Sequence, residues 1–324
     1  PILADPRSGL RTPATRTVAA ADALLRVPAV AAPALDIVVR LGRPWASKVV
    51  NQWLDALPAS LPQVLVDPHA AWIDPGRRSS HVAAADPTAL AAAVVAAVGS
   101  PPRDRSWVQR WAGLEAAAQA AIDFTLAAES DVSEPALARG LLAAVADGTV
   151  LVASSSMPVR DLEWWGQPRL GVRVVANRGA NGIDGMVSTA IGVALGSGAP
   201  TVALLGDLAF LYDAGALLWA RDRDLDLTIV VADNNGGGIF SFLPQAAVLT
   251  PDTFERYWGT PHNVDLAGVA GAYGLATRRL ADLDELADAV KGGPGVRVVI
   301  VGTDRDNNVA VHGRIHAAVA AAVA

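Results

Sequence analysis

The chain contains no cysteine and few aromatic residues. It has 324 residues, of which 5% are aromatic and five are histidines. The absence of cysteine excludes disulfides, thiolate metal sites and cysteine nucleophiles. His69, His81 and His262 are too far apart in the sequence to suggest a zinc site, so we interpret them as surface or loop residues.

The sequence also lacks an excess of positive charge and a long uninterrupted apolar run. Lys and Arg number 26 against 32 Asp and Glu, a net charge of −6, which argues against a nucleic-acid or anionic-membrane partner. The longest uncharged stretch, 186–206, is broken by Gly and Pro at 196–200, so we predict a helix, a turn and a buried strand. No basic segment followed by an apolar core marks an export signal, and we predict a cytoplasmic protein.

Continuous β-branched runs alternate with helical patterns, which predicts an α/β fold of two doubly wound parallel-sheet domains. In the first part we expect a buried parallel strand at 35–41, a helix at 47–57 and a strand at 62–67. Two Ala- and Leu-rich helices should follow, at 87–98 and 105–129. Five buried strands are expected in the second part, at 149–153, 172–176, 201–205, 227–231 and 296–301. The predicted domains are 1–128, a central domain ending in a connector helix, and 129–324.

Oxygen ligands follow two of the predicted strands. Asp207 follows the strand 201–205 after one glycine, Gly206, and Asn234 follows the strand 227–231 and precedes three glycines. Since ligands bind at the carboxyl ends of parallel strands, these groups predict a Mg²⁺ site that also holds phosphate. The alternative is structural, with Asp207 capping a helix and the Asn-Gly run forming a turn.

The spacing of these motifs resembles that of the thiamine diphosphate enzymes. Gly206-Asp207 is followed, after 26 further residues, by Asn234-Asn235. Within that superfamily the chain resembles the 2-succinyl-5-enolpyruvyl-6-hydroxy-3-cyclohexene-1-carboxylate synthases of menaquinone biosynthesis, which are transferases. The segments that carry this resemblance are 154–161, 177–185, 206–208, 234–240 and 259–262.

The resemblance implies thiamine diphosphate and Mg²⁺, or Mn²⁺, as cofactors. Asp207 and Asn234 would bind the metal through side-chain oxygens, and Gly236 through its backbone carbonyl. Ile183 would support the bent form of the cofactor, although it could also be an ordinary core residue. The remaining cofactor-binding residues implied are Leu208, Ala209, Gly237 and Ile239.

The resemblance further implies 2-oxoglutarate and isochorismate as substrates. Ser156, Arg160 and Arg178 would bind the distal carboxylate of 2-oxoglutarate, and arginine suits bidentate binding of a carboxylate. Without the resemblance, the arginines could equally form surface salt bridges to acidic neighbours such as Asp161 or Asp184. Three further residues would line the isochorismate pocket, namely Phe240, Leu243 and Lys48.

One part of such an enzyme has no match in this sequence. In the superfamily a glutamate on a separate pyrimidine-binding domain activates the cofactor, whereas residues 1–10 resemble the start of the central domain. We therefore expect that domain to lie on another chain or to have been lost by truncation, and the enzyme to be at least a homodimer. Two alternatives stay open, namely another thiamine diphosphate-dependent decarboxylase or carboligase, and a non-catalytic binding remnant.

Overall fold

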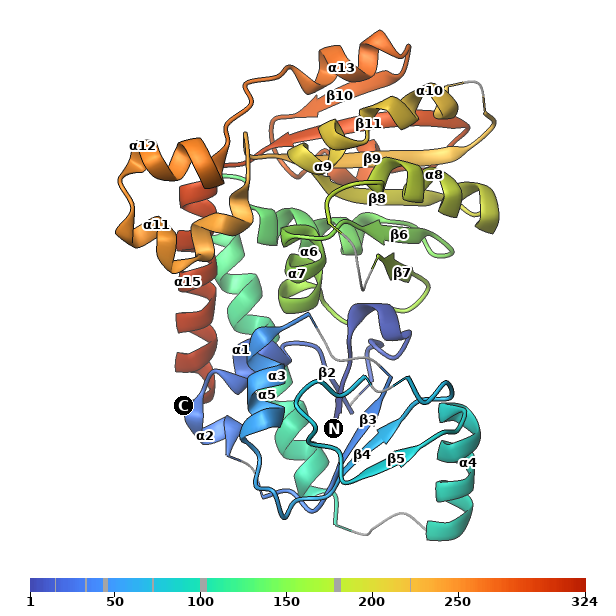
Figure 1. The fold of residues 1–324 in the computed structure, drawn as a ribbon, viewed down its shortest axis with the longest axis vertical. Helices are drawn as coiled ribbons and strands as arrows, with labels where there is room; N and C mark the ends of the chain where they lie inside the picture. Colours follow the sequence, from blue (N-terminus) through green and yellow to red (C-terminus); the bar gives the residue numbers. More distant parts are fainter. Residues whose placement is uncertain are drawn as a thin grey trace.

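The fold is built around two parallel sheets, a large one and a small one. The computed structural model describes residues 1–14, 16–32, 34–42, 46–71, 73–99, 104–177, 182–221 and 223–324. A six-stranded sheet forms the upper part of Figure 1 and a three-stranded sheet the lower part. Every strand pair of this part of the chain is parallel, which confirms the predicted α/β fold class. Among the described residues, no helix combines the length and the apolar character needed to cross a bilayer.

The six-stranded sheet contains all five strands predicted for the second part of the chain. In spatial order its strands are β10 (Ala276–Leu280), β11 (Gly295–Gly302), β9 (Asp226–Asp233), β8 (Thr201–Gly206), β6 (Val150–Ala153) and β7 (Arg173–Ala176). Strand β10 was not predicted. It lies at an edge of the sheet, and its two arginines hide the apolar pattern of a buried strand.

Helices cover both faces of this sheet because successive strand side chains point to opposite sides. On β8, Val202 and Leu204 face one apolar cluster, whereas Ala203 and Leu205 face another. The first cluster is closed by α6 (Glu134–Ala144), α7 (Met157–Trp165) and α14 (Leu286–Ala289). The second is closed by α8 (Met186–Ser197), α9 (Asp207–Tyr212), α10 (Leu217–Ala220) and α13 (Leu266–Ala272). The helix, turn and strand predicted for 186–206 are thus confirmed as α8 and β8.

The smaller sheet has the order β3 (Val38–Leu41), β4 (Gln63–Val66) and β5 (His81–Ala83). The prediction of a buried strand at 35–41 is wrong as to burial, since Val39 is 53% exposed and Leu41 is 50% exposed. The reason is that β3 is an edge strand with a single neighbour, whereas Leu65 and Val66 on the central strand β4 are fully buried. A separate short pair joins β1 (Ile2–Leu3) to β2 (Thr17–Val18).

A third apolar cluster combines helices from both ends of the chain. The C-terminal helix α15 (Arg305–Val323) packs along α5 (Ser106–Ala127), and both lie beside α1 (Ala21–Leu25) (Figure 1). The cluster buries Leu24, Ile122, Trp165 and Ile315 together. The other helices of the first part are α2 (Pro28–Ala31), α3 (Lys48–Ala56) and α4 (Pro87–Val98). The three helices predicted in this part are confirmed, α4 with the predicted bounds and the other two, α3 and α5, with slightly shorter ends. The predicted boundary near residue 128 falls between α5 and α6.

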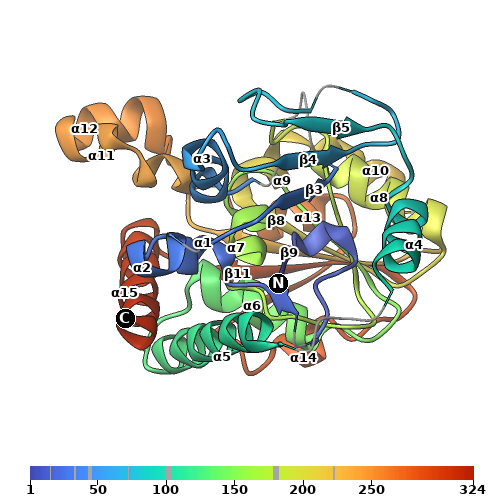
Figure 2. The same ribbon diagram turned by 90° about the horizontal axis from the view of Figure 1, so that it is seen from below.

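Between β9 and α13 the chain makes an excursion that projects from the rest of the structure (Figure 2). It consists of the 3-10 helix η3 (Gly238–Phe242), α11 (Pro244–Val248), α12 (Pro251–Phe254) and the π-helical turn η4 (Glu255–Gly259). The 3-10 turns η1 (Pro6–Ser8) and η2 (Ala214–Ala216) complete the elements. The excursion returns residues 259–263 to the carboxyl end of β9, where they meet the loop that left it.

Candidate functional site

The candidate site lies at the carboxyl edge of the large sheet. The chain leaves β6 for β7 on one side and later returns to β8 on the other side of β6, so the strand order reverses between β6 and β8. Such a reversal is where open parallel sheets bind ligands. Asp207 follows β8 at this edge, and Asn234 follows β9, the neighbour of β8.

Asp207 is the first residue of α9 and is 1% exposed. Its Oδ1 accepts a hydrogen bond from the Leu208 backbone N–H at 2.6 Å, and its Oδ2 accepts one from the Gly236 N–H at 2.8 Å. Oδ2 also lies 3.2 Å from Nε2 of His262. Burial raises the pKa of Asp207, and these hydrogen bonds partly oppose the shift by stabilising the carboxylate. The carboxyl edge of the sheet therefore contains a buried acid, whose oxygens contact the start of α9 and the segments around Gly236 and His262.

The amide of Asn234 has one satisfied end and one unsatisfied end. Its Nδ2 donates to Oε1 of Glu134 at 2.6 Å. Its Oδ1 is buried and has no hydrogen-bond partner among the described residues. A buried oxygen without a donor is costly unless something outside the chain binds it, and an amide oxygen is a ligand that Mg²⁺ accepts. The unpaired Oδ1 thus fits a bound divalent cation.

The glycine loop after Asn234 packs tightly against the returning excursion. Gly236 has φ +149°, and a Cβ on it would overlap the carbonyl oxygen of Gly259. A Cβ on Gly237 would lie 2.6 Å from the carbonyl oxygen of Trp258, and the Gly237 N–H donates to the Gly259 carbonyl at 2.8 Å. Asn235 binds the same returning segment, because its Oδ1 accepts hydrogen bonds from the backbone N–H groups of both His262 and Asn263. Glycine is therefore required for this backbone to approach so closely.

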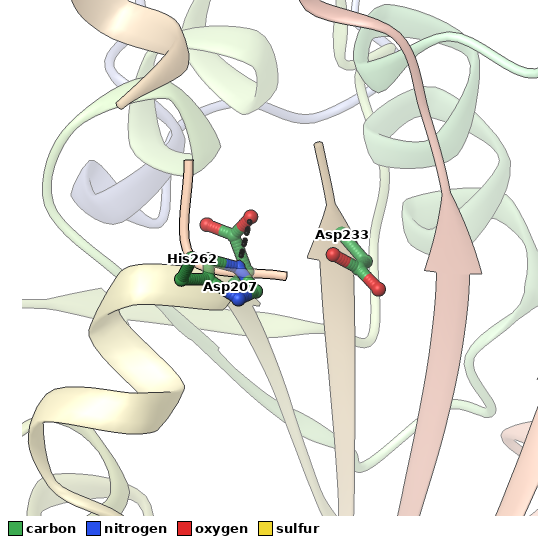
Figure 3. Close-up of side chains that lie close together, drawn as sticks. All are labelled: Asp207, Asp233 and His262. Carbon is green, nitrogen blue, oxygen red and sulfur yellow. Dashed lines mark hydrogen bonds and ion pairs between the residues drawn. The ribbon is translucent and has the colours of Figure 1, made fainter. Parts of the chain in front are cut away.

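Asp207, Asp233 and His262 form a cluster that could hold a metal ion. One ligand atom from each lies within 4.8 Å of the others. In Figure 3, Asp207 and His262 lie next to each other, and Asp233 stands at the end of the neighbouring strand. The loop position predicted for His262 agrees with the structure, but sequence analysis missed its contact with Asp207. The two residues are 55 positions apart in the sequence, and this separation gave no signal of the contact.

Glu134, at the start of α6, is a second buried acid that sequence analysis did not assign to the site. It is 4% exposed, and its Oε1 lies 3.5 Å from Oγ1 of Thr303 in addition to the bond from Asn234. Burial, followed by the charges of Asp161 and Asp207, raises the pKa of Glu134 to about 8. An acid behind a candidate metal ligand is an arrangement typical of the outer shell of metal sites.

Ser156 and Arg160 lie together at the N-terminal end of α7. Ser156 has φ +70°, an uncommon value for a residue with a side chain, and its carbonyl accepts a hydrogen bond from Nη1 of Arg160 at 2.5 Å. Asp161 is 1% exposed and lies 3.0 Å from Nε2 of His312, so it is not a partner for a surface salt bridge. Arg178 lies outside the described residues.

The other predicted site residues differ in burial. Ile183 is half-buried against the apolar cluster on the α8 face, and Lys48 is exposed at the start of α3. Ser47, which precedes Lys48, donates its N–H to Oε1 of Glu163 on α7, so the start of α3 lies against the helix that carries Arg160. On α9, Leu208 is half-buried and Ala209 is buried. In and directly after η3, Ile239 is half-buried, Phe240 is 38% exposed and Leu243 is 40% exposed.

Comparison with known proteins agrees with this geometry. Residues 168–301 match the family model "Thiamine pyrophosphate enzyme, C-terminal TPP binding domain". The chain is 40% identical over 307 residues to the 2-succinyl-5-enolpyruvyl-6-hydroxy-3-cyclohexene-1-carboxylate synthase of Myxococcus xanthus, covering 93% of this chain and 51% of that protein. The predicted resemblance to this synthase is confirmed.

Other synthases match the whole chain. Those of Chloroflexus aurantiacus and Thermobifida fusca are 39% and 42% identical to it, and each alignment covers 100% of this chain and 56% of the relative. The chain thus spans about half the length of the curated synthases it matches. The family match confirms the prediction of thiamine diphosphate as the cofactor, and the cluster of Asp207, Asp233 and His262 agrees with an accompanying divalent cation.

Proposed function

We propose that this chain forms the metal- and diphosphate-binding part of a 2-succinyl-5-enolpyruvyl-6-hydroxy-3-cyclohexene-1-carboxylate synthase. The reaction removes CO₂ from 2-oxoglutarate and adds the remaining succinyl unit to isochorismate. The observation that carries the proposal is the buried, unpaired Oδ1 of Asn234, in a loop whose Gly236 N–H donates to the buried carboxylate of Asp207, in a region that matches a thiamine pyrophosphate-binding domain. When bound, thiamine diphosphate supplies the electron sink that decarboxylation of a 2-oxo acid needs.

The residues of this chain hold and orient the cofactor. Asp207 and Asn234 bind the cation through side-chain oxygens, and Gly236 offers its backbone carbonyl. The close packing of Gly236 against Gly259 supports this role, because it fixes the path of the loop. Four further residues would contact the cofactor, namely Leu208 and Ala209 on α9, Gly237 in the glycine loop, and Ile239 on η3. Ile183, which packs against the core on the α8 face, would support the bent form of the cofactor.

Arg160 and Ser156 select a substrate with a second carboxylate. Arg160 projects from the first turn of α7, and its bond to the Ser156 carbonyl orients the guanidinium. A guanidinium binds a carboxylate through two parallel hydrogen bonds, which distinguishes 2-oxoglutarate from pyruvate. We propose that Arg178 joins them. Phe240 and Leu243, both partly exposed, provide the apolar side of the isochorismate pocket, and Lys48 its positive side.

Proton transfer to the cofactor requires a glutamate from a pyrimidine-binding domain. We propose that residues outside this sequence supply that domain, either on another chain or in a longer form of this one, and that the active assembly is a homodimer or larger. Glu134 does not take this part, because it is buried behind Asn234 and bonded to its amide.

The test combines binding with turnover. The chain is titrated with thiamine diphosphate with and without Mg²⁺, and is then mixed with a separately produced pyrimidine-binding domain, 2-oxoglutarate and isochorismate. We expect Mg²⁺-dependent binding by the chain alone and CO₂ release only in the mixture. Metal-independent binding, or no binding, would favour a non-catalytic remnant. Turnover of pyruvate in preference to 2-oxoglutarate would indicate another decarboxylase or carboligase.

A further inference from the structure

A side-chain amide binds a cation at one end only. Oδ1 of an asparagine carries lone pairs, whereas Nδ2 carries two N–H groups that a cation repels. An asparagine that serves as a metal ligand must therefore be held with its oxygen toward the cation. In this chain the orientation of Asn234 decides whether its oxygen or its N–H group is the end left without a partner.

Glu134 fixes the orientation of the Asn234 amide through a hydrogen bond to its nitrogen end. Its Oε1 accepts the 2.6 Å hydrogen bond from Nδ2 of Asn234, which leaves Oδ1 buried and unpaired within the described part of the chain. Thr303, at the end of β11, lies with its hydroxyl 3.5 Å from the same Oε1. Two donors thus face Oε1, which accepts as a carboxylate oxygen or, when the proton of Glu134 is on Oε2, as a carbonyl oxygen. An amide turned the other way would set its own oxygen against this acceptor.

The position of Glu134 is itself well supported. Its backbone N–H donates to Oδ1 of the buried Asn308 at 3.2 Å, and Ser133 caps the helix that Glu134 begins. Gly238 leaves room for the amide of Asn234, because a Cβ at position 238 would lie only 2.6 Å from its Nδ2. The amide nitrogen therefore has a space next to Gly238 and an acceptor on Glu134.

We propose that Glu134 is a positioning residue for the metal site, which holds the amide of Asn234 so that Oδ1 faces the cation. This inference rests on the proposed function, because it takes Asn234 as a metal ligand. It adds a role for an acid that neither the motif spacing nor the cluster of Asp207, Asp233 and His262 contains. Removing such a supporting partner typically weakens metal binding by about 10- to 100-fold.

The test separates orientation from charge and from folding. Mn²⁺ is titrated into the 324-residue chain in the presence of thiamine diphosphate, and Mn²⁺ binding is followed by electron paramagnetic resonance. The native chain is compared with Glu134→Leu and Glu134→Gln. Leucine removes the acceptor, and we expect Mn²⁺ binding to weaken by about 10- to 100-fold. Glutamine keeps an acceptor oxygen for Asn234, and we expect its Mn²⁺ affinity to stay within about threefold of the native value.

The control variant is Leu137→Ala on the same helix, which cuts a fully buried side chain and should lower the unfolding temperature without changing Mn²⁺ affinity. Native-like Mn²⁺ binding by Glu134→Leu would overturn the inference. So would an equal loss in Glu134→Gln, which would show that charge matters rather than orientation, or an equal loss in Leu137→Ala, which would show a folding effect. Absence of metal-linked binding in the native chain would instead refute the proposed function.

Discussion

The contact between the glycine loop and the returning excursion gives a sharp prediction. Gly236→Ala places a methyl group where the Gly259 carbonyl oxygen now lies, at a backbone angle of φ +149° that L-residues rarely adopt. The strained backbone costs about 1–3 kcal/mol. Separating the two segments also weakens the bond from Gly237 N–H to Gly259, a loss of about 1 kcal/mol. We therefore expect a loss of about 2–4 kcal/mol in the free energy of unfolding.

The assay is thermal unfolding followed by calorimetry or circular dichroism. At about 2 °C per kcal/mol for a chain of this size, the midpoint should fall by roughly 4–8 °C. Gly192→Ala is the matched control, because Gly192 lies inside α8, and its Cβ would have nothing within 4 Å. Alanine is favoured over glycine in a helix by about 1 kcal/mol, so this variant should unfold at a higher temperature. A Gly236→Ala midpoint equal to or above the native one would refute the argument from close packing.

Three further predictions concern the metal, the substrate and pH. Asp207→Asn should reduce the Mg²⁺-linked affinity for thiamine diphosphate, measured by calorimetric titration, by at least roughly 100-fold. Loss of a residue that only supports a ligand can already cost that much, and Asp207 is proposed as a ligand itself. Unchanged affinity would exclude Asp207 as a ligand. Arg160→Ala in the assembled enzyme should lower kcat/KM for 2-oxoglutarate by about 10- to 100-fold, the effect of a lost charged hydrogen bond, and leave pyruvate unaffected. Arg173→Ala, at the opposite end of the sheet, should change neither. Burial raises the pKa of Glu163 to about 7, so folding is most favourable below about pH 4.5 and loses roughly 3 kcal/mol as pH rises to 7. Glu163→Gln should remove this loss in denaturant titrations between pH 5 and 8, and an unchanged pH profile would contradict the assignment.

The sequence predicted those elements whose side chains form a continuous pattern. The buried strands of the large sheet are runs of Val, Ile and Leu, and five were recognised because both faces are covered by helices. Strand β10 was not predicted because an edge strand tolerates arginines. Strand β3 is also an edge strand, and its apolar residues are therefore more exposed than predicted. Burial depends on neighbours that a single segment does not reveal.

The candidate site shows the same limit. Asp207 and Asn234 were predicted from their places after consecutive strands, which the sheet brings to one edge. His262 reaches Asp207 through the excursion, and Glu134 reaches Asn234 from a helix 100 residues earlier. Neither contact follows from spacing along the chain, because each depends on how separate layers pack.

The apolar cluster shared by α1, α5 and α15 bears on how the chain can be divided. Residues near both ends of the sequence, such as Leu24 and Ile315, are buried in it together with Trp165 from α7. A cut at the predicted boundary near residue 128 would strip partners from both fragments and expose Ile122 to water. We therefore expect the two sheets to melt as one cooperative unit, and neither fragment to form a native fold unless the other is present. Such fragments would serve better in a complementation assay than as independent proteins.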